Sequence, residues 1–96
     1  MGEVIRRRVV VAGLVQGVYF RDTCRRAALA WHVTGWVRNR RDGAVEAVFE
    51  GADVDVERML RWARHGPEDA VVKSVAVHEE EPEGLTGFMV LPTAQS

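Results

Sequence analysis

The sequence of 96 residues lacks the features that mark several classes of protein. It has a single cysteine, Cys24, which excludes an internal disulfide, and one thiol with three scattered histidines makes no metal cage. No apolar stretch approaches the roughly 18 residues that cross a bilayer, and the N-terminal segment lacks the apolar run of a secretory signal. We therefore expect a cytoplasmic protein without a membrane-spanning segment.

What is present is the composition of an ordinary globular domain. Hydrophobic residues make up 47% of the chain and charged residues 28%, which argues against disorder and against collagen-like order. Domains usually contain about 100–150 residues, and the sequence shows no repeat, low-complexity stretch or interdomain linker. We expect residues 1–96 to form a single domain with one modest core.

Charge is distributed unevenly along the chain. Residues 1–48 contain nine arginines and four acidic residues, whereas residues 49–96 contain four basic and ten acidic residues. A basic half of this kind attracts anions, either a nucleic acid or a small phosphate-like ligand. A compositional bias explains the asymmetry equally well, because twelve of the thirteen basic residues are arginine. The composition leaves both interpretations open.

Hydrophobic periodicity predicts alternating strands and helices. We expect strands at residues 8–12, 34–39, 44–50, 70–78 and 88–91, an amphipathic helix at residues 22–32, and a second helix that is capped by Asp53 and stopped by Gly66 and Pro67. Asp42–Gly43 predicts the turn of a hairpin. The arginines at residues 6–8 and the glutamates at residues 79–81 are expected to be solvated.

This order, β-α-β-β-α-β with a short terminal strand, predicts an α+β fold. Two crossovers around a central hairpin give a ferredoxin-like split β-α-β sandwich, with a mainly antiparallel sheet and both helices on one face. Because this fold carries many unrelated functions, it predicts no chemistry by itself.

The segment GLVQGVYFR, residues 13–21, joins the first strand to the first helix. Its two glycines allow successive backbone N–H groups to turn inward as an anion-binding nest, and the helix N-terminus adds unsatisfied donors. Arg21 lies at the start of the helix, where its guanidinium can bind two phosphoryl oxygens. The segment matches neither the P-loop nor the dinucleotide-binding pattern, and a glycine-flanked turn is also common architecture.

Two further residues have both a structural and a functional interpretation. Asn39 precedes the hairpin, where asparagine commonly opens a turn with its own side chain. Its carboxamide can also donate and accept hydrogen bonds without titrating, and so could hold a water molecule. Cys24 shares a helix face with Phe20 and Ala28, which favours a buried apolar role over that of a nucleophile.

Two motifs of the chain resemble the signatures of the acylphosphatases. The segment VAGLVQGVYFR, residues 11–21, resembles the first signature, and GWVRN, residues 35–39, resembles the second together with DGAVE at residues 42–46 and Gly51. The resemblance covers the whole chain. Two long motifs in the right order and at the right separation are a specific signal.

The resemblance implies hydrolysis of the carboxyl–phosphate anhydride of a small acyl phosphate, without a metal or cofactor, to a carboxylate and inorganic phosphate. It further implies that Arg21 binds the phosphoryl group and that Asn39 orients the attacking water. Backbone amides would complete the phosphate cradle, and these belong to Val15, Gln16, Gly17, Val18, Tyr19 and Phe20. For Gln16 we expect a contribution to loop geometry rather than to chemistry.

Partners follow from the same resemblance. We expect a monomer that binds inorganic phosphate as product and competitive inhibitor, and that binds neither nucleic acid nor membrane. The last strand departs from the family, because relatives often carry a basic residue where this chain has residues 89–92, MVLP. The alternative is a non-catalytic module for small anions or nucleic acid on the same fold, although the aromatic run of RNA-recognition domains is missing.

Overall fold

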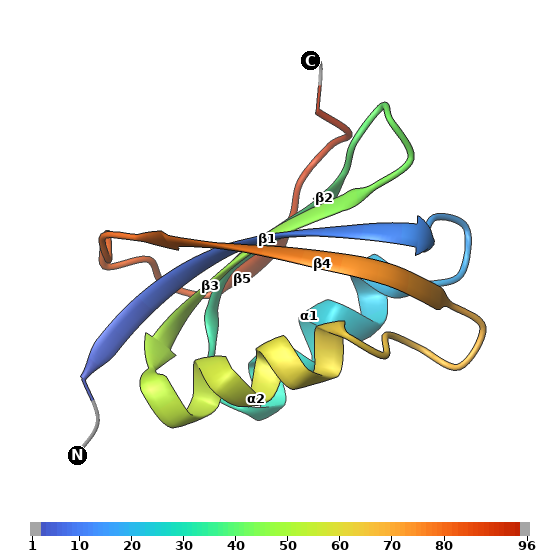
Figure 1. The fold of residues 1–96 in the computed structure, drawn as a ribbon. Helices are drawn as coiled ribbons and strands as arrows, with labels where there is room; N and C mark the ends of the chain where they lie inside the picture. The colour runs from blue at the N-terminus through green and yellow to red at the C-terminus, as the bar shows by residue number, and fades with distance from the viewer. Residues whose placement is uncertain (1–2, 95–96) are drawn as a thin grey trace.

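Five strands form one sheet in the computed structural model, which describes residues 3–94. The elements in chain order are β1 (Val4–Leu14), α1 (Phe20–Ala30), β2 (Thr34–Asn39), β3 (Val45–Ala52), α2 (Asp53–Ala63), β4 (Val71–Glu80) and β5 (Phe88–Val90). The spatial order is β4-β1-β3-β2-β5, and only β2 and β5 pair in parallel. Both helices cover the same face of the sheet (Figure 1). The predicted ferredoxin-like α+β fold is confirmed.

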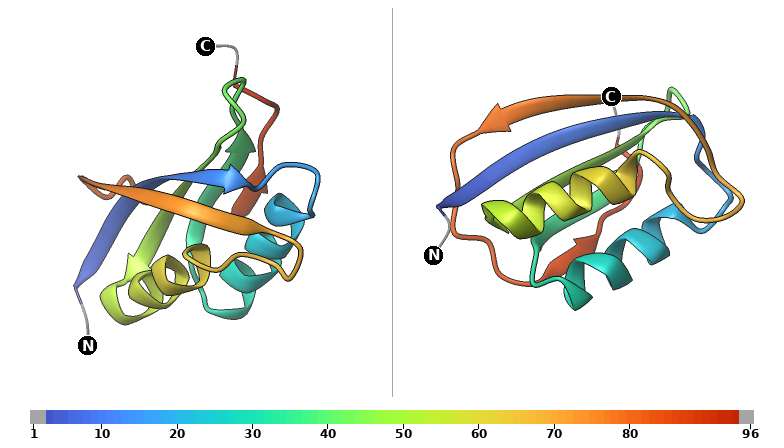
Figure 2. Two further views of the ribbon diagram at one scale, coloured as in Figure 1. Left: turned by 45° about the vertical axis from the view of Figure 1, so that its right-hand side comes forward. Right: turned by 60° about the horizontal axis from the view of Figure 1, so that its bottom comes forward.

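The split arrangement arises from the hairpin between β2 and β3. β3 pairs antiparallel with both β1 and β2, so β1 and β2 run in the same direction with β3 between them. α1 connects β1 to β2 across the helix-covered face, and α2 connects β3 to β4 in the same way (Figure 2). This topology brings the end of β1 close to the end of β2, where the two sequence motifs lie.

The core lies between the sheet and the two helices. Alternate residues of the central strands point toward the helices, and both helices direct an apolar stripe toward them. The fully buried side chains include Val9, Val11, Val37, Phe49 and Met59. Cys24 also has no exposed surface, and its burial raises the pKa of its thiol well above the usual range. The predicted apolar role of Cys24 is confirmed.

Two strands are longer than the sequence predicts. β1 begins at Val4 rather than at residue 8, and β4 ends at Glu80 rather than at residue 78. The prediction that residues 6–8 and 79–81 are solvated is confirmed for Glu79 and Glu81, which are exposed. It is wrong for Arg6, which is 6% exposed, while Arg7, Arg8 and Glu80 are half-buried. These charged residues belong to strands because β1 and β4 pair along them, with Arg6 opposite Glu80.

The helices also differ from prediction at their first residues. α1 begins at Phe20 rather than at residue 22, because its N-cap is Tyr19 in the left-handed conformation at φ 62°. Asp53 is the first residue of α2 and not its cap, which is Ala52. The other bounds differ by about two residues at most. Each helix has 11 residues, and no helix in the described chain is long and apolar enough to cross a membrane.

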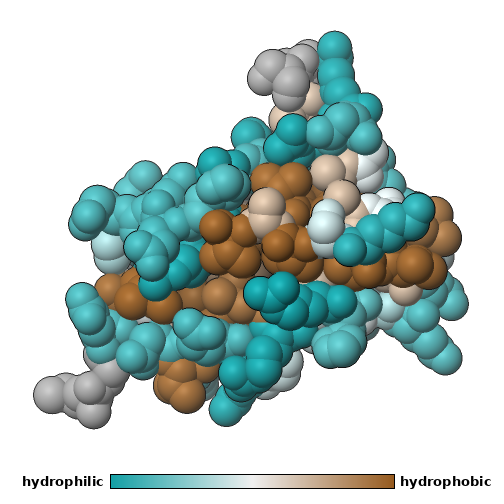
Figure 3. Space-filling model, viewed as in Figure 1, coloured by the Kyte–Doolittle hydropathy of each residue, from teal (hydrophilic) through white to brown (hydrophobic). Residues whose placement is uncertain are grey.

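Apolar residues also gather along the side of the molecule formed by β4. Figure 3 shows them as a band that is bordered by hydrophilic residues on both sides. β4 is an edge strand, and its Val71 and Val77 are 54% and 38% exposed. The helices therefore cover the centre of the sheet more completely than this edge.

A network of charged side chains crosses the face of the sheet that turns away from the helices. Arg6 and Arg8 alternate along β1 with the core valines, so their side chains lie on the opposite face. Arg6 Nε lies 2.8 Å from Glu80 Oε1, and Arg6 Nη1 lies 3.6 Å from Glu50 Oε1. Arg8 contacts Glu80 at 3.1 Å and Glu46 at 3.3 Å. The arginines of the first half of the chain thus pair with glutamates that come mostly from the second half.

Glu50 joins this network to the connection between β4 and β5. Its carboxylate accepts hydrogen bonds from the backbone N–H groups of Glu83, Gly84 and Leu85 at 2.8–2.9 Å, and Glu50 is only 3% exposed. Burial alone would raise the pKa of Glu50, but these donors and Arg6 outweigh it and lower the pKa. Hydrogen bonds from Arg6 and Arg8 likewise lower the pKa of Glu80.

Backbone hydrogen bonds hold the C-terminal segment on β2, where the sequence lacks the basic residue that the resemblance led us to look for. The N–H of Leu91 donates to the carbonyl of Val37 at 2.9 Å, and the N–H of Ala94 donates to the carbonyl of Asn39 at 3.0 Å. Arg25 of α1 adds a hydrogen bond to the carbonyl of Phe88 at 3.2 Å.

The lowered pKa values predict a pH dependence of stability. A carboxyl group whose pKa is lower in the folded state stabilises that state above its unfolded pKa, and this contribution is lost as the pH falls through the folded pKa. We expect the free energy of unfolding to fall between about pH 5 and about pH 2. Glu50→Gln should cost about 2 kcal/mol at neutral pH and flatten this dependence.

Urea unfolding at several pH values measures both effects. Glu79→Gln is the matched control, because the Glu79 side chain is 84% exposed and its one ion pair in the described chain, with Arg7, is long at 3.6 Å. Its stability should stay within about 0.5 kcal/mol of the wild type. An unchanged pH profile in Glu50→Gln would contradict the role assigned to Glu50.

Candidate active site

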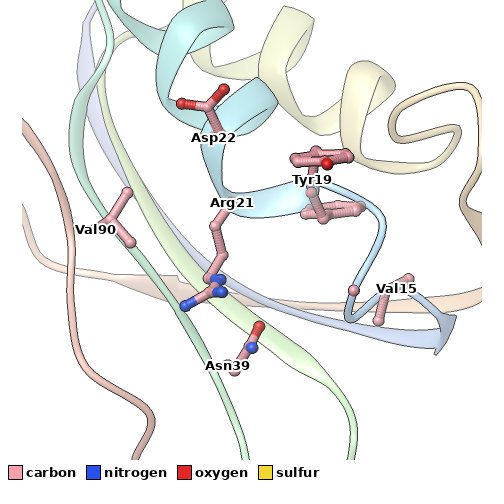
Figure 4. Close-up of a pocket in the computed structure, with 8 residues that line it drawn as sticks. Val15, Tyr19, Arg21, Asp22, Asn39 and Val90 are labelled. Atoms are coloured by element: carbon pink, nitrogen blue, oxygen red, sulfur yellow. The ribbon is translucent and has the colours of Figure 1, made fainter.

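A pocket of about 490 Å³ lies between the β1–α1 loop, the start of α1 and the ends of β2 and β5 (Figure 4). The residues that line it are Val15, Gly17, Tyr19, Phe20, Arg21, Asp22, Asn39 and Val90. The fold therefore brings the first sequence motif and the end of the second to one cavity.

The β1–α1 loop contributes backbone N–H groups to this cavity. Among residues 3–94, no hydrogen-bond acceptor is found for the N–H groups of residues 15–22. The chain passes through the left-handed region at Gly17, with φ 75°, and at Tyr19, with φ 62°. Unpaired N–H groups next to the N-terminus of a helix are suited to bind an anion.

Gly13 determines where the loop leaves the sheet. The pairing of β1 with β4 shifts its register between Ala12 and Gly13, and Gly13 adopts φ 133°. A Cβ atom at this position would lie 2.2 Å from the carbonyl oxygen of Val71. A larger residue would therefore push β4 away, and glycine is required by the close approach of the two strands.

Gln16 attaches the loop to the β2–β3 hairpin. Its Nε2 donates to the carbonyl of Arg40 at 2.8 Å and to the carbonyl of Ala44 at 2.9 Å. The expectation that Gln16 serves loop geometry agrees with these contacts. Neither Gln16 nor Val18 is among the residues that line the pocket, and Val18 packs against the core.

Arg21 lies in the first turn of α1 and extends into the pocket toward Asn39 (Figure 4). Within the described part of the chain, its guanidinium forms no hydrogen bond or ion pair. Arg6, Arg8 and Arg38, by contrast, each contact a glutamate. Arg21 therefore offers a charge in the cavity that no carboxylate of residues 3–94 contacts directly.

Asn39 is the last residue of β2, and its side chain faces the same cavity. Its Oδ1 is buried and has no hydrogen-bond partner among the described residues. The turn of the hairpin is stabilised by Asp42 instead, whose Oδ1 accepts a hydrogen bond from the N–H of Ala44 at 3.0 Å and whose pKa this bond lowers. The interpretation of the Asn39 side chain as a turn-former is therefore wrong.

Two lining residues were not predicted from the sequence. Asp22 follows Arg21 in the first turn of α1, and its Oδ2 lies 3.1 Å from Nη2 of Arg26. Its position next to Arg21 is a signal that could have identified it. Val90 comes from β5, and only the pairing of β5 with β2 brings it to the pocket.

Within residues 3–94, N–H groups without acceptors, an arginine without an acidic contact and a buried amide oxygen meet in one pocket of a ferredoxin-like domain. This is the chemistry of an anion-binding α+β domain. The acylphosphatase family model matches residues 7–90. An acylphosphatase of Gloeobacter violaceus is 54% identical over 95% of this chain and 98% of its own length. One of Trichormus variabilis is 57% identical over 92% of this chain and 87% of its own.

Solved structures agree with the sequence comparison. The structure of an acylphosphatase from Coxiella burnetii superposes with a TM-score of 0.88 at 35% identity, covering 92% of this chain and 93% of that one. The chain belongs to the acylphosphatase family, and the predictions of family and enzyme class are confirmed.

The Gln16 contacts predict that the loop loses affinity for phosphate when they are removed. Gln16→Met keeps the length of the side chain but cannot donate to the two carbonyls. We expect inorganic phosphate to bind about three- to tenfold more weakly by isothermal titration calorimetry, and the protein to lose about 1–2 kcal/mol of stability.

Leu14→Met is the control, because Leu14 is 57% exposed and precedes the loop. Its phosphate affinity should match that of the wild type. Unaltered phosphate affinity in Gln16→Met would mean that the loop keeps its conformation without this attachment.

Proposed function

We propose that the pocket hydrolyses acyl phosphates by direct attack of a water molecule on a phosphoryl group held by Arg21 and the loop N–H groups. The products are a carboxylate and inorganic phosphate. One observation carries this proposal. Unpaired donors, an arginine without an acidic contact and the buried Oδ1 of Asn39, none of which has a partner among residues 3–94, converge in one cavity.

Binding of the phosphoryl group is supported by the charge of the cavity. The Arg21 guanidinium can donate to two phosphoryl oxygens, and the N–H groups of residues 15–20 can donate to the same group. In phosphoryl transfer the equatorial oxygens carry the developing charge, so donors that are already oriented stabilise the transition state. The loop and Arg21 would therefore supply most of the electrostatic catalysis.

The bond to be broken needs little acid catalysis. Its leaving group is a carboxylate, which is a weak base and departs without protonation. Asn39 would accept a hydrogen bond from the water and hold it in line with this bond. Neither Arg21 nor the Asn39 amide can take up a proton, so we assign the proton of the water to an oxygen of the bound phosphoryl group.

The proposal includes the remaining expectations for partners and cofactors. Residues 1–96 would act as a single cytoplasmic domain and as a monomer, with inorganic phosphate as a competitive inhibitor. Fixed donors and a weakly basic leaving group make metal or cofactor assistance unnecessary, so turnover should persist with excess chelator. Binding of nucleic acid is not favoured, because Arg6, Arg8 and Arg38 are engaged by glutamates.

The guanidinium geometry of Arg21 can be tested with Arg21→Lys. Lysine keeps the charge but loses the two-pronged donor, so we expect kcat/KM for acetyl phosphate to fall about 10²–10³-fold and inorganic phosphate to inhibit more weakly. Phosphate release measured in steady state gives both values. Arg26→Lys is the control, since the Arg26 side chain is 78% exposed. Full turnover by Arg21→Lys would remove Arg21 from the mechanism.

The role of Asn39 predicts a different kinetic pattern. Asn39→Ala should lower kcat about 10²-fold or more while the inhibition constant of inorganic phosphate changes less than about twofold. Thr34→Ala controls for damage to β2, because Thr34 bonds the Glu50 carbonyl at 3.1 Å and does not line the pocket. If phosphate binding falls together with kcat, Asn39 binds the phosphoryl group rather than the water.

A further inference from the structure

The pocket is larger than a phosphoryl group needs. Its volume of about 490 Å³ falls within the range of roughly 300–1,000 Å³ that accommodates whole small-molecule ligands. Arg21, Asn39 and the loop N–H groups form its polar part. The rest of the lining is apolar apart from one carboxylate, so the remaining space suits an uncharged group attached to the phosphate.

Tyr19 and Val90 present accessible apolar surface in this space. Val15 and Phe20 also line the pocket, but they are 1% and 3% exposed and belong to the core. Tyr19 is 80% exposed and Val90 is 42% exposed. They lie on opposite sides of Arg21 (Figure 4). A group bound to the phosphoryl group at Arg21 therefore has an accessible apolar contact on each side.

The backbone holds the Tyr19 ring in this exposed position. Tyr19 has φ 62°, a left-handed conformation that is rare and costly for a bulky side chain. Its ring makes no aromatic contact among the described residues, whereas the neighbouring Phe20 ring packs at 5.1 Å on Trp62. The strained backbone thus places an unpacked aromatic ring at the pocket.

Asp22 adds a negative charge to the same lining. Its carboxylate is exposed and its contact with Arg26 lies between two exposed side chains, so this pairing neutralises the charge only in part. A second negative charge on a bound ligand would be repelled there. A neutral ligand group would not.

We propose that Tyr19 and Val90 bind the acyl group of the substrate and that Asp22 disfavours acyl groups with a second negative charge. The preferred substrates are then acyl phosphates of uncharged, apolar carboxylic acids. This inference rests on the proposed function, because it requires the phosphoryl group to lie at Arg21.

The first experiment compares kcat/KM for benzoyl phosphate with kcat/KM for acetyl phosphate. The ratio cancels effects on the phosphoryl group, which both substrates share. Tyr19→Asn removes the ring, and asparagine tolerates the left-handed backbone. We expect the ratio to fall about three- to tenfold in Tyr19→Asn and to stay within about twofold in Tyr19→Phe, which keeps the ring.

Val90 allows the same comparison on the other side of the pocket. Val90→Thr preserves the shape of the side chain and should lower the ratio about two- to threefold. Met89→Thr is the matched control, because Met89 precedes Val90 in β5, is 61% exposed and does not line the pocket. Its ratio should equal that of the wild type.

Succinyl phosphate, which carries a second carboxylate, tests the charge of the rim. Relative to acetyl phosphate, its kcat/KM should rise about two- to fourfold in Asp22→Asn and fall in Arg26→Gln, which leaves Asp22 unpaired. Both changes should shrink in about 0.5 M salt. Equal ratios in all variants would overturn the acyl-binding inference while leaving the proposed function intact. If the wild type hydrolyses none of the three substrates, the proposed function itself is overturned.

Discussion

The backbone N–H groups between β1 and α1 find no acceptor in the described part of the chain, and this constraint explains much of the structure around them. Without backbone hydrogen bonds of its own, the loop needs other contacts to fix its conformation. It is held from outside by the approach of β1 to β4 at Gly13 and by the hydrogen bonds of Gln16 to the hairpin. An anion in the pocket would satisfy the same donors.

A second constraint on the pocket is the pairing of charged side chains across the sheet. Most arginines of the first half of the chain contact acidic residues on neighbouring strands or on their own helix or turn. Arg21 has no such contact among residues 3–94. The guanidinium of Arg21 is therefore available to an anion in the pocket, whereas most other arginines of this half of the chain already contact carboxylates.

The pocket also combines two kinds of recognition at one place. Its polar part is built from the loop and from the ends of strands that the sheet fixes, which suits the fixed geometry of a phosphoryl group. Its accessible apolar part consists of Tyr19 and Val90, which would contact the acyl group under the proposal above. Recognition of the phosphoryl group and recognition of the acyl group would thus come from different residues of one pocket.

The sequence by itself determined the order of strands and helices, the family and the two residues proposed for catalysis, because periodicity, glycine positions and motifs are local properties of the chain. It could not determine that Arg6 and Glu80 lie within paired strands, since their burial depends on partners 74 residues apart in the chain. It could not assign Val90 to the pocket or free Asn39 from the turn, because both outcomes depend on which segments pack together. Only the tertiary structure decided these points, since contacts between distant segments follow from the packing of the sheet and not from the residues next to them.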